Sequence, residues 1–195
     1  MSETNSDSAI LEATRRRLTE KQADTVDRLT KAAVEVITRE GYAALTVRMV
    51  AAAAGVGTAT AYTYFSSKEH LVAEVFWRRL VQLPAAELAE DQTTAERVVG
   101  TLRQVSLIVG GETELAGAVT SALLGQDPDV AHLRLRIGLE IRNRIARALG
   151  PDPDLDILES FEMLYAGALV RAGMGYGTYA EMADRIEKSV HLILG

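Results

Sequence analysis

The chain contains no cysteine, and this absence removes several kinds of chemistry at once. Disulfide bonds, thiolate metal sites and cysteine nucleophiles are all excluded. Aromatic residues make up only 5% of the sequence, and no apolar run approaches the roughly 20 residues that a membrane-spanning helix needs. Residues 1–9 are polar and lack the apolar stretch of a signal peptide. We therefore expect a cytoplasmic globular protein.

Acidic residues are missing from one continuous stretch of the chain. Residues 41–68 hold no Asp or Glu, although the chain has 27 of them and a net charge of −6. Residues 1–70 carry nine basic and nine acidic residues, so the whole negative excess falls in residues 71–195. A surface that approaches phosphates has to be free of anions. The acid-free stretch therefore indicates a contact with nucleic acid, or else an apolar helix pair that carries little charge.

Capping and stop signals predict an all-α fold. Thr19 with Gln22, and Ser66 with Glu69, have the spacing of capping boxes at helix starts. Glycines such as Gly41 follow the apolar periodicity where a helix should end. No segment reads as a strand. The signals predict about nine helices, near 19–40, 47–54, 58–64, 66–83, 93–110, 112–124, 128–149, 154–174 and 178–194.

Two short predicted helices lie inside the acid-free stretch, between Thr46 and Phe65. Gly55 separates them and can take a positive φ without strain. On the second helix Ala61 and Phe65 are four residues apart and should point inward. The opposite face then presents small or uncharged side chains that a major groove about 12 Å wide can accept. This is the geometry of a helix-turn-helix, in which the second helix reads DNA bases.

A recognisable pattern of residues runs through this region, between about Leu29 and Leu71. Its members are Gly41, Tyr42, Thr46, Ala51, Ala54, Gly55, Val56, Thr60, Tyr62, Tyr64, Phe65, Lys68, Glu69 and Leu71. With these residues the region resembles the tetracycline-repressor (TetR) family of bacterial regulators. The resemblance implies an all-helical homodimer with an N-terminal DNA-binding domain and a variable C-terminal domain that binds a small ligand. The expected domains are a flexible arm (1–18), the helix-turn-helix domain (19–66) and the ligand-binding and dimerisation domain (67–195).

Carried over residue by residue, the resemblance implies base reading by Thr58 and Ala59 and phosphate contacts by several neighbours. It implies that Arg48 contacts a base or a phosphate and that Lys68 contacts a phosphate, and for both an ordinary surface charge is the alternative. Tyr64 is implied to reach a base or the backbone, or else it packs against the first helix. The full set of expected DNA contacts is Arg48, Gly57, Thr58, Ala59, Thr60, Tyr62, Thr63, Tyr64 and Lys68. The arginines at 15–17 are expected to add contacts in the minor groove.

Three residues depart from the family pattern. Gly57 stands where a side-chain cap is usual, which costs only a few tenths of a kcal/mol. Ala59 replaces a common glycine, and Ala61 replaces a common leucine. We therefore expect a recognition helix of unusually small residues, with backbone contacts through Thr60, Tyr62 and Lys68 that matter more than side-chain base readout.

The C-terminal two thirds predict a dimer surface and a ligand pocket. The last two predicted helices carry apolar faces, at Leu158, Phe161, Leu164, Tyr165, Ala168 and Leu169 and at Ile186, Val190, Ile193 and Leu194. With the resemblance these predict a homodimer through the last two helices, and a monomer with both faces in its core is the alternative. The candidate lining of the pocket is Phe76, Trp77, Leu80, Arg103, Leu107, Met163 and Tyr165.

Neither catalysis nor a cofactor finds support. His70, His132 and His191 are scattered in the sequence. The alternating carboxylates Asp152, Asp154 and Asp156 lack the following residues of a calcium loop. We expect that the protein binds no metal and no cofactor and is not an enzyme. The sequence predicts a repressor that binds a palindromic DNA operator and is released by a small lipophilic effector. The alternative is an all-helical enzyme or small-molecule binder that has lost DNA binding.

Overall fold

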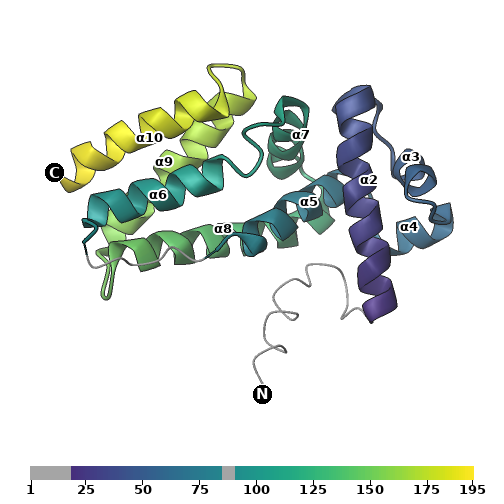
Figure 1. Cartoon of the computed structure of the whole chain (residues 1–195), viewed down its shortest axis with the longest axis horizontal. Helices are drawn as coiled ribbons and strands as arrows, with labels where there is room; N and C mark the ends of the chain where they lie inside the picture. Colours follow the sequence, from purple (N-terminus) through teal and green to yellow (C-terminus); the bar gives the residue numbers. More distant parts are fainter. Residues whose placement is uncertain (1–18, 85–90) are drawn as a thin grey trace. The chain divides into compact units, whose positions relative to one another are not determined.

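The structure is a computed structural model that describes residues 19–84 and 91–195, and within these ranges every regular element is a helix (Figure 1). This confirms the all-α fold predicted from the sequence. The expected N-terminal arm and its arginines lie outside the described residues. The helices are α2 (Glu20–Ala44), α3 (Val47–Ala53), α4 (Thr58–Tyr64), α5 (Lys68–Gln82), α6 (Thr94–Ser106), α7 (Thr113–Leu124), α8 (Pro128–Leu149), α9 (Leu155–Gly173) and α10 (Tyr179–Leu194).

Side-chain caps fix several helix starts. At α6 the Thr93 amide donates to the Glu96 carboxylate at 2.7 Å, and at α10 the Thr178 amide donates to Glu181 at 2.7 Å. These backbone bonds, with a second from each threonine hydroxyl, hold the pKa of both glutamates below the usual value. Asp127 accepts from two amides at the start of α8. Thr93, Asp127 and Thr178 are therefore the side-chain caps of these three helices.

The predicted start of α5 is wrong by two residues. The helix begins at Lys68, and its cap is Ser67, whose hydroxyl oxygen accepts from the His70 amide at 3.0 Å. Ser66 lies one residue before this cap, and its hydroxyl donates to the Asp129 carboxylate. The partner of Ser66 is 63 residues away, so a local capping pattern could not reveal it.

Helix α6 ends earlier than predicted, at Ser106 rather than near Gly110. The backbone tightens there, because the Ile108 amide donates to Val105 three residues back and the Gly110 amide donates to Leu107. The predicted stop at Gly41 is confirmed in a modified form. Gly41 has φ 77 and ψ 161, which are not helical values, so this glycine separates the long regular part of α2 from a short last turn.

The helices group into two compact units, each with its own core. The first contains the described residues up to Val81 together with Glu112–Leu135, and here α2 packs against α3 and α7. Its core includes Leu29, Val36 and Phe65, all fully buried. The second contains Gln82–Gly111 and Arg136–Gly195, and here α10 packs against α6 and α9.

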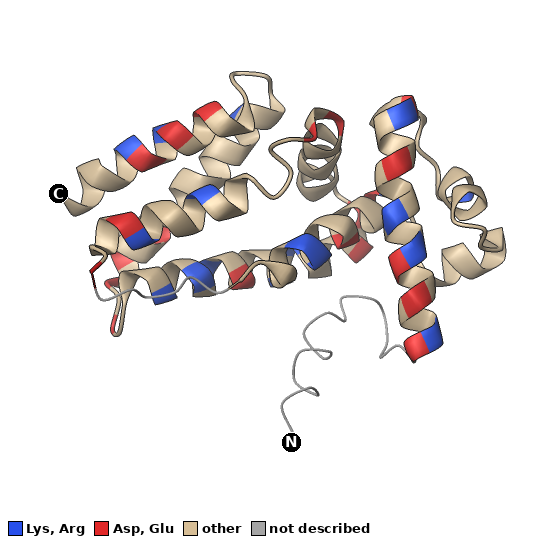
Figure 2. Cartoon of the chain, in the orientation of Figure 1, with Lys and Arg blue, Asp and Glu red and all other residues tan. Residues whose placement is uncertain are grey.

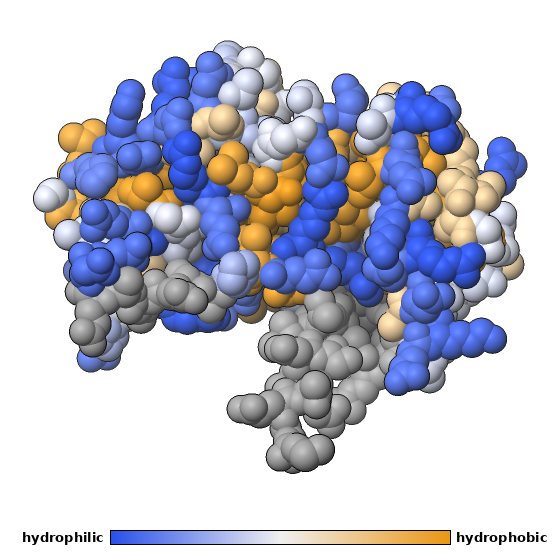
Figure 3. Space-filling model, in the orientation of Figure 1, coloured by the Kyte–Doolittle hydropathy of each residue, from blue (hydrophilic) through white to orange (hydrophobic). Residues whose placement is uncertain are grey.

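The apolar faces of α9 and α10 are divided between the core and the surface. Several residues predicted for a dimer face are buried within the chain itself, among them Leu158, Phe161 and Ile186. Apolar surface nevertheless remains, visible in Figure 3 near the C-terminal end of α10. None of the described helices is long and apolar enough to cross a bilayer. The large exposed apolar residues on or beside these helices are Leu155, Met163, Met174, Tyr176, Leu192 and Ile193.

Candidate DNA interface

Helix α3 begins at a threonine cap. Thr46 has an extended backbone, and its hydroxyl oxygen accepts from the Met49 amide at 3.2 Å. Val47, Val50 and Ala51 bury one face of α3. Such a cap contributes about 1 kcal/mol, so the cap and the buried face together fix where α3 starts and which way it faces.

The turn between α3 and α4 is held by a side chain from α2. Gly55 has φ 62, a conformation that alanine and larger residues adopt only with strain. The Arg28 guanidinium donates to the Ala54 carbonyl at 2.5 Å and to the Gly55 carbonyl at 3.1 Å. These are carbonyls at the end of α3 that have no partner inside the helix. Arg28 therefore connects α2 to the turn, a role that the sequence did not indicate.

Helix α4 presents the outward face that the sequence predicted. Thr58, Ala59, Thr60 and Thr63 are exposed, and Tyr62 is 49% exposed. The inward residues Ala61 and Phe65 are fully buried, and Tyr64 is only 8% exposed. The structure thus places Tyr64 in the packed side of the motif, as the alternative interpretation of that residue expected.

Charge on this part of the molecule is sparse and basic. In Figure 2 helix α4 carries neither red nor blue, and α3 shows blue but no red. The basic residue of α3 is Arg48, whose side chain is exposed. Gly57, the residue before α4, has no side chain that could cap the helix. The first backbone amides of α4 are therefore available as hydrogen-bond donors to another molecule. The surface therefore offers donors and one cation to a polyanion.

Lys68 lies against the end of α2. Its ammonium donates to the Tyr42 carbonyl at 3.1 Å and to the Ala43 carbonyl at 3.4 Å, and lies 4.5 Å from the centroid of the Tyr42 ring. The Tyr42 hydroxyl donates to Glu69 at 3.2 Å. Burial, and next the Glu69 carboxylate, raise the pKa of that hydroxyl, so it stays protonated. Lys68 therefore has a structural role that the sequence did not predict, beside the expected phosphate contact.

The segment between α4 and α5 is bonded to the start of α8. Ser66 donates to Asp129 and lies 3.4 Å from the Nδ1 atom of buried His70. Burial opposes ionisation of Asp127, but hydrogen bonds from Ser67 and from two α8 amides outweigh it and hold the pKa of Asp127 below the usual value. Two carboxylates thus hold the two serines that follow the predicted recognition helix.

The residues predicted to line a ligand pocket fall in both units. Phe76, Trp77 and Leu80 are buried on α5 in the first unit. In the second unit Met163 is 65% exposed and borders a groove, whereas Tyr165 is buried beside a small cavity. Met163 and Tyr165 therefore border different hollows of the second unit.

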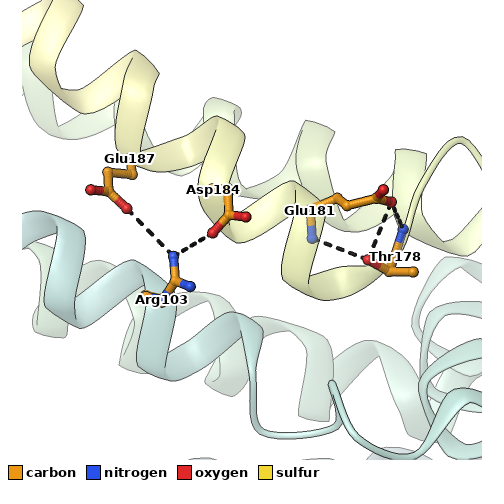
Figure 4. A network of polar contacts seen from close by, with 5 residues as sticks. All are labelled: Arg103, Thr178, Glu181, Asp184 and Glu187. Atoms are coloured by element: carbon orange, nitrogen blue, oxygen red, sulfur yellow. Dashed lines mark hydrogen bonds and ion pairs between the residues drawn. The ribbon is translucent and has the colours of Figure 1, made fainter.

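Two further candidates lie at the C-terminal part of α6. Leu107 is 42% exposed. Arg103 forms ion pairs with α10, at 2.7 Å to Asp184 and 3.4 Å to Glu187, as Figure 4 shows. All three charged side chains are about half exposed. In the structure Arg103 therefore fastens α6 to α10 at the surface.

Comparison with known proteins agrees with this geometry. Residues 29–75 match the family described as bacterial regulatory proteins, tetR family. The chain is 46% identical over 176 residues to an HTH-type transcriptional regulator of Mycobacterium tuberculosis, covering 89% of this chain and 82% of the relative. It is also 26% identical over 173 residues to the HTH-type transcriptional repressor KstR of Rhodococcus jostii, covering 86% and 82%.

Solved structures share the fold. A TetR transcriptional regulator from Rhodococcus superposes with a TM-score of 0.72 at 21% identity, over 90% of this chain and 98% of that one. The regulator FadR of Bacillus subtilis, solved in complex with stearoyl-CoA, gives a TM-score of 0.61 at 18% identity, over 84% and 96%. The likeness therefore extends through both units, well beyond the helix-turn-helix.

Proposed function

The chain belongs to the TetR family of bacterial regulatory proteins and is a DNA-binding transcriptional regulator, and from this premise we propose that it is a repressor released from its operator by a small apolar effector. Such a protein works in the cytoplasm, where its DNA is. We propose that residues 19–66 form the DNA-binding domain and that residues 67–195 form the domain for effector binding and dimerisation.

The observation that carries the DNA-binding role is the outward face of α4. Its exposed side chains are small or uncharged, and Arg48 supplies a cation beside them. We propose that Thr58 and Ala59 approach base edges, while Thr60, Thr63, Tyr62 and Lys68 contact the backbone. The free amides that follow Gly57 are donors for a phosphate. Arg48 is proposed as a base contact, worth about 1–3 kcal/mol of discrimination against the wrong base.

A single added carboxylate tests this assignment. Ala59→Glu places an anion on the outward face of α4, whereas the matched control Ala131→Glu places one on an exposed position of α8. Because like charges at an interface cost several kcal/mol, Ala59→Glu should weaken binding more than about 100-fold. Binding is measured by mobility shift on sites mapped in the host genome. Equal binding by both variants, or no bound site for the wild type, would contradict the proposal.

A homodimer is proposed through α9 and α10. Two recognition helices about 34–36 Å apart would read successive turns of a palindrome. Met163 and Leu192, 65% and 86% exposed, supply apolar surface on these helices. Met163→Lys should shift the chain toward monomer in analytical ultracentrifugation. Leu135→Lys changes a similarly exposed residue on α8 and should leave the dimer intact; dissociation by both variants, or by neither, would contradict this interface.

The effector is proposed to act by a population shift. It would favour a conformer in which the two recognition helices no longer match successive grooves. KstR is named as a repressor and FadR was solved with stearoyl-CoA, which supports repression and an apolar effector here. Spin labels on the α4 helices of the dimer should change their separation when effector is added. An unchanged separation together with release from DNA would contradict this mechanism.

A further inference from the structure

The second unit contains a small cavity, and one of its lining residues is a tyrosine with a buried hydroxyl group. Tyr165 on α9 is 5% exposed, and its Oη atom has no hydrogen-bond partner among the described residues. A buried hydroxyl without a partner is uncommon because its desolvation is not compensated. The cavity measures about 10 Å³, roughly the room for one water molecule. Its lining is Ser106, Tyr165, Ala168, Leu169, Tyr179 and Met182.

The lining selects for one kind of ligand atom. These six described residues include no charged side chain. Burial, and next the neighbouring Tyr179, raise the pKa of the Tyr165 hydroxyl, so it stays protonated and acts as a donor. A carboxylate confined to this cavity would lose its hydration beside uncharged side chains, which is costly, because Arg171 and Arg185 line the groove on the other side of Met182 and not the cavity itself. A neutral acceptor such as a carbonyl oxygen meets the donor at a much smaller cost.

Met182 is the wall of the cavity that can move. It borders this cavity and also a groove of about 250 Å³ between α9 and α10. Methionine adapts readily because its side chain is unbranched and flexible. Gly177 leaves room for the end of the Met182 side chain, since a Cβ atom at residue 177 would lie 2.7 Å from the Met182 Cε. A shift of Met182 toward the groove would therefore enlarge the cavity.

We propose that Tyr165 donates a hydrogen bond to the carbonyl oxygen of an uncharged, otherwise apolar effector, and that Met182 moves to admit it. The ligand class is a neutral ketone, ester or lactone. The inference rests on the proposed effector-responsive function and names the chemistry of its site.

Calorimetric titration of the full chain with octan-2-one and with octanoate tests the proposal. Octan-2-one should bind at least about tenfold more tightly than octanoate. Tyr165→Phe should weaken octan-2-one by about 2–10-fold, the range expected for one neutral hydrogen bond. The ligand-free Tyr165→Phe protein should nevertheless melt about 2–8 °C higher, because a buried unpartnered hydroxyl is gone. Met182→Ala, which enlarges the cavity, should strengthen octan-2-one binding. The control Tyr176→Phe changes an exposed tyrosine and should alter none of these values.

The outcomes separate this inference from the function on which it rests. Octanoate binding as tightly as the ketone, no ketone binding at all, or unchanged ketone affinity in Tyr165→Phe would each overturn the donor role of Tyr165. Unchanged or weaker ketone affinity in Met182→Ala would overturn the moving wall. A mobility shift of the ligand-free protein on its operator is measured in parallel. If the protein binds its operator but not octan-2-one, only the proposed ligand chemistry is wrong. If the protein does not bind an operator, the regulator function is wrong.

Discussion

Replacing Arg28 by alanine tests whether the turn of the DNA-binding motif depends on a side chain from another helix. The substitution removes both hydrogen bonds from the guanidinium to the carbonyls of Ala54 and Gly55. It leaves α2 intact, since alanine favours helix more than arginine does. The expected result is a less stable first unit and weaker operator binding, because α4 follows directly on the released turn.

The size of the effect follows from the exposure of Arg28. A hydrogen bond to a charged group contributes about 1.5–3 kcal/mol when it is shielded from water. Arg28 is exposed, so we discount each of its bonds to about 0.5–1 kcal/mol. The two bonds together give about 1–2 kcal/mol, or about 2–8 °C in Tm for a chain of this size.

Urea unfolding measures this loss, with Trp77 as the fluorescent probe. It is the only tryptophan of the chain and is buried in the first unit. The control is Arg39→Ala, which removes an exposed arginine of the same helix that pairs only with its neighbour Glu40 in the described contacts. That change should stay within about 0.5 kcal/mol. Arg28→Lys should lose an intermediate amount, because an ammonium lacks the fork that reaches two carbonyls. Equal midpoints for Arg28→Ala and Arg39→Ala would refute the reasoning.

Three further predictions concern the same unit. Gly55→Ala should cost about 1–2 kcal/mol in urea unfolding, because φ 62 is unfavourable for alanine; no loss would mean that the turn relaxes to negative φ. Lys68→Met should lower the slope of log affinity for the operator against log salt concentration by about 0.9, because a cation that binds a phosphate displaces counterions. Tyr62→Phe should weaken binding and leave this slope unchanged. Equal slopes for wild type and Lys68→Met would mean that Lys68 has only a structural role. Asp127 has a depressed pKa in the fold, so its stabilising contribution is present above its usual pKa of 3.8 and is lost as the pH falls through its folded value. In acid unfolding, Asp127→Asn should therefore lose less stability over this pH range than the wild type. Identical acid unfolding curves would contradict this prediction.

Local signals predicted the recognition helix well. The sequence placed α4 at 58–64, and the structure has the same bounds, because the glycine turn and the buried Ala61 and Phe65 lie within a few residues of it. The outward exposure of Thr58 and Tyr62 follows from helical periodicity alone. These features depend on neighbours in sequence, and such patterns can be read without a structure.

Features that depend on distant partners were missed. Arg28 meets carbonyls 26 and 27 residues away, and Ser66 meets a carboxylate 63 residues away. No spacing in the sequence marks either pairing. Most of the candidate pocket residues are apolar, and Arg103, the charged one among them, is paired with acids on α10. Apolar periodicity identifies buried faces, but it does not tell which of them surround a cavity.

The outward face of α4 has a consequence for how this regulator diverges from its relatives. Its exposed threonines and alanine make no ion pair among the described contacts, and substitutions at such surface positions usually change stability by no more than about 0.5 kcal/mol. The packing that holds the helix comes from Ala61, Tyr64 and Phe65 on the opposite side. Operator preference can therefore drift by single substitutions without an accompanying folding defect. Duplicated copies of such a gene could acquire separate targets, and so avoid crosstalk, while keeping the same scaffold.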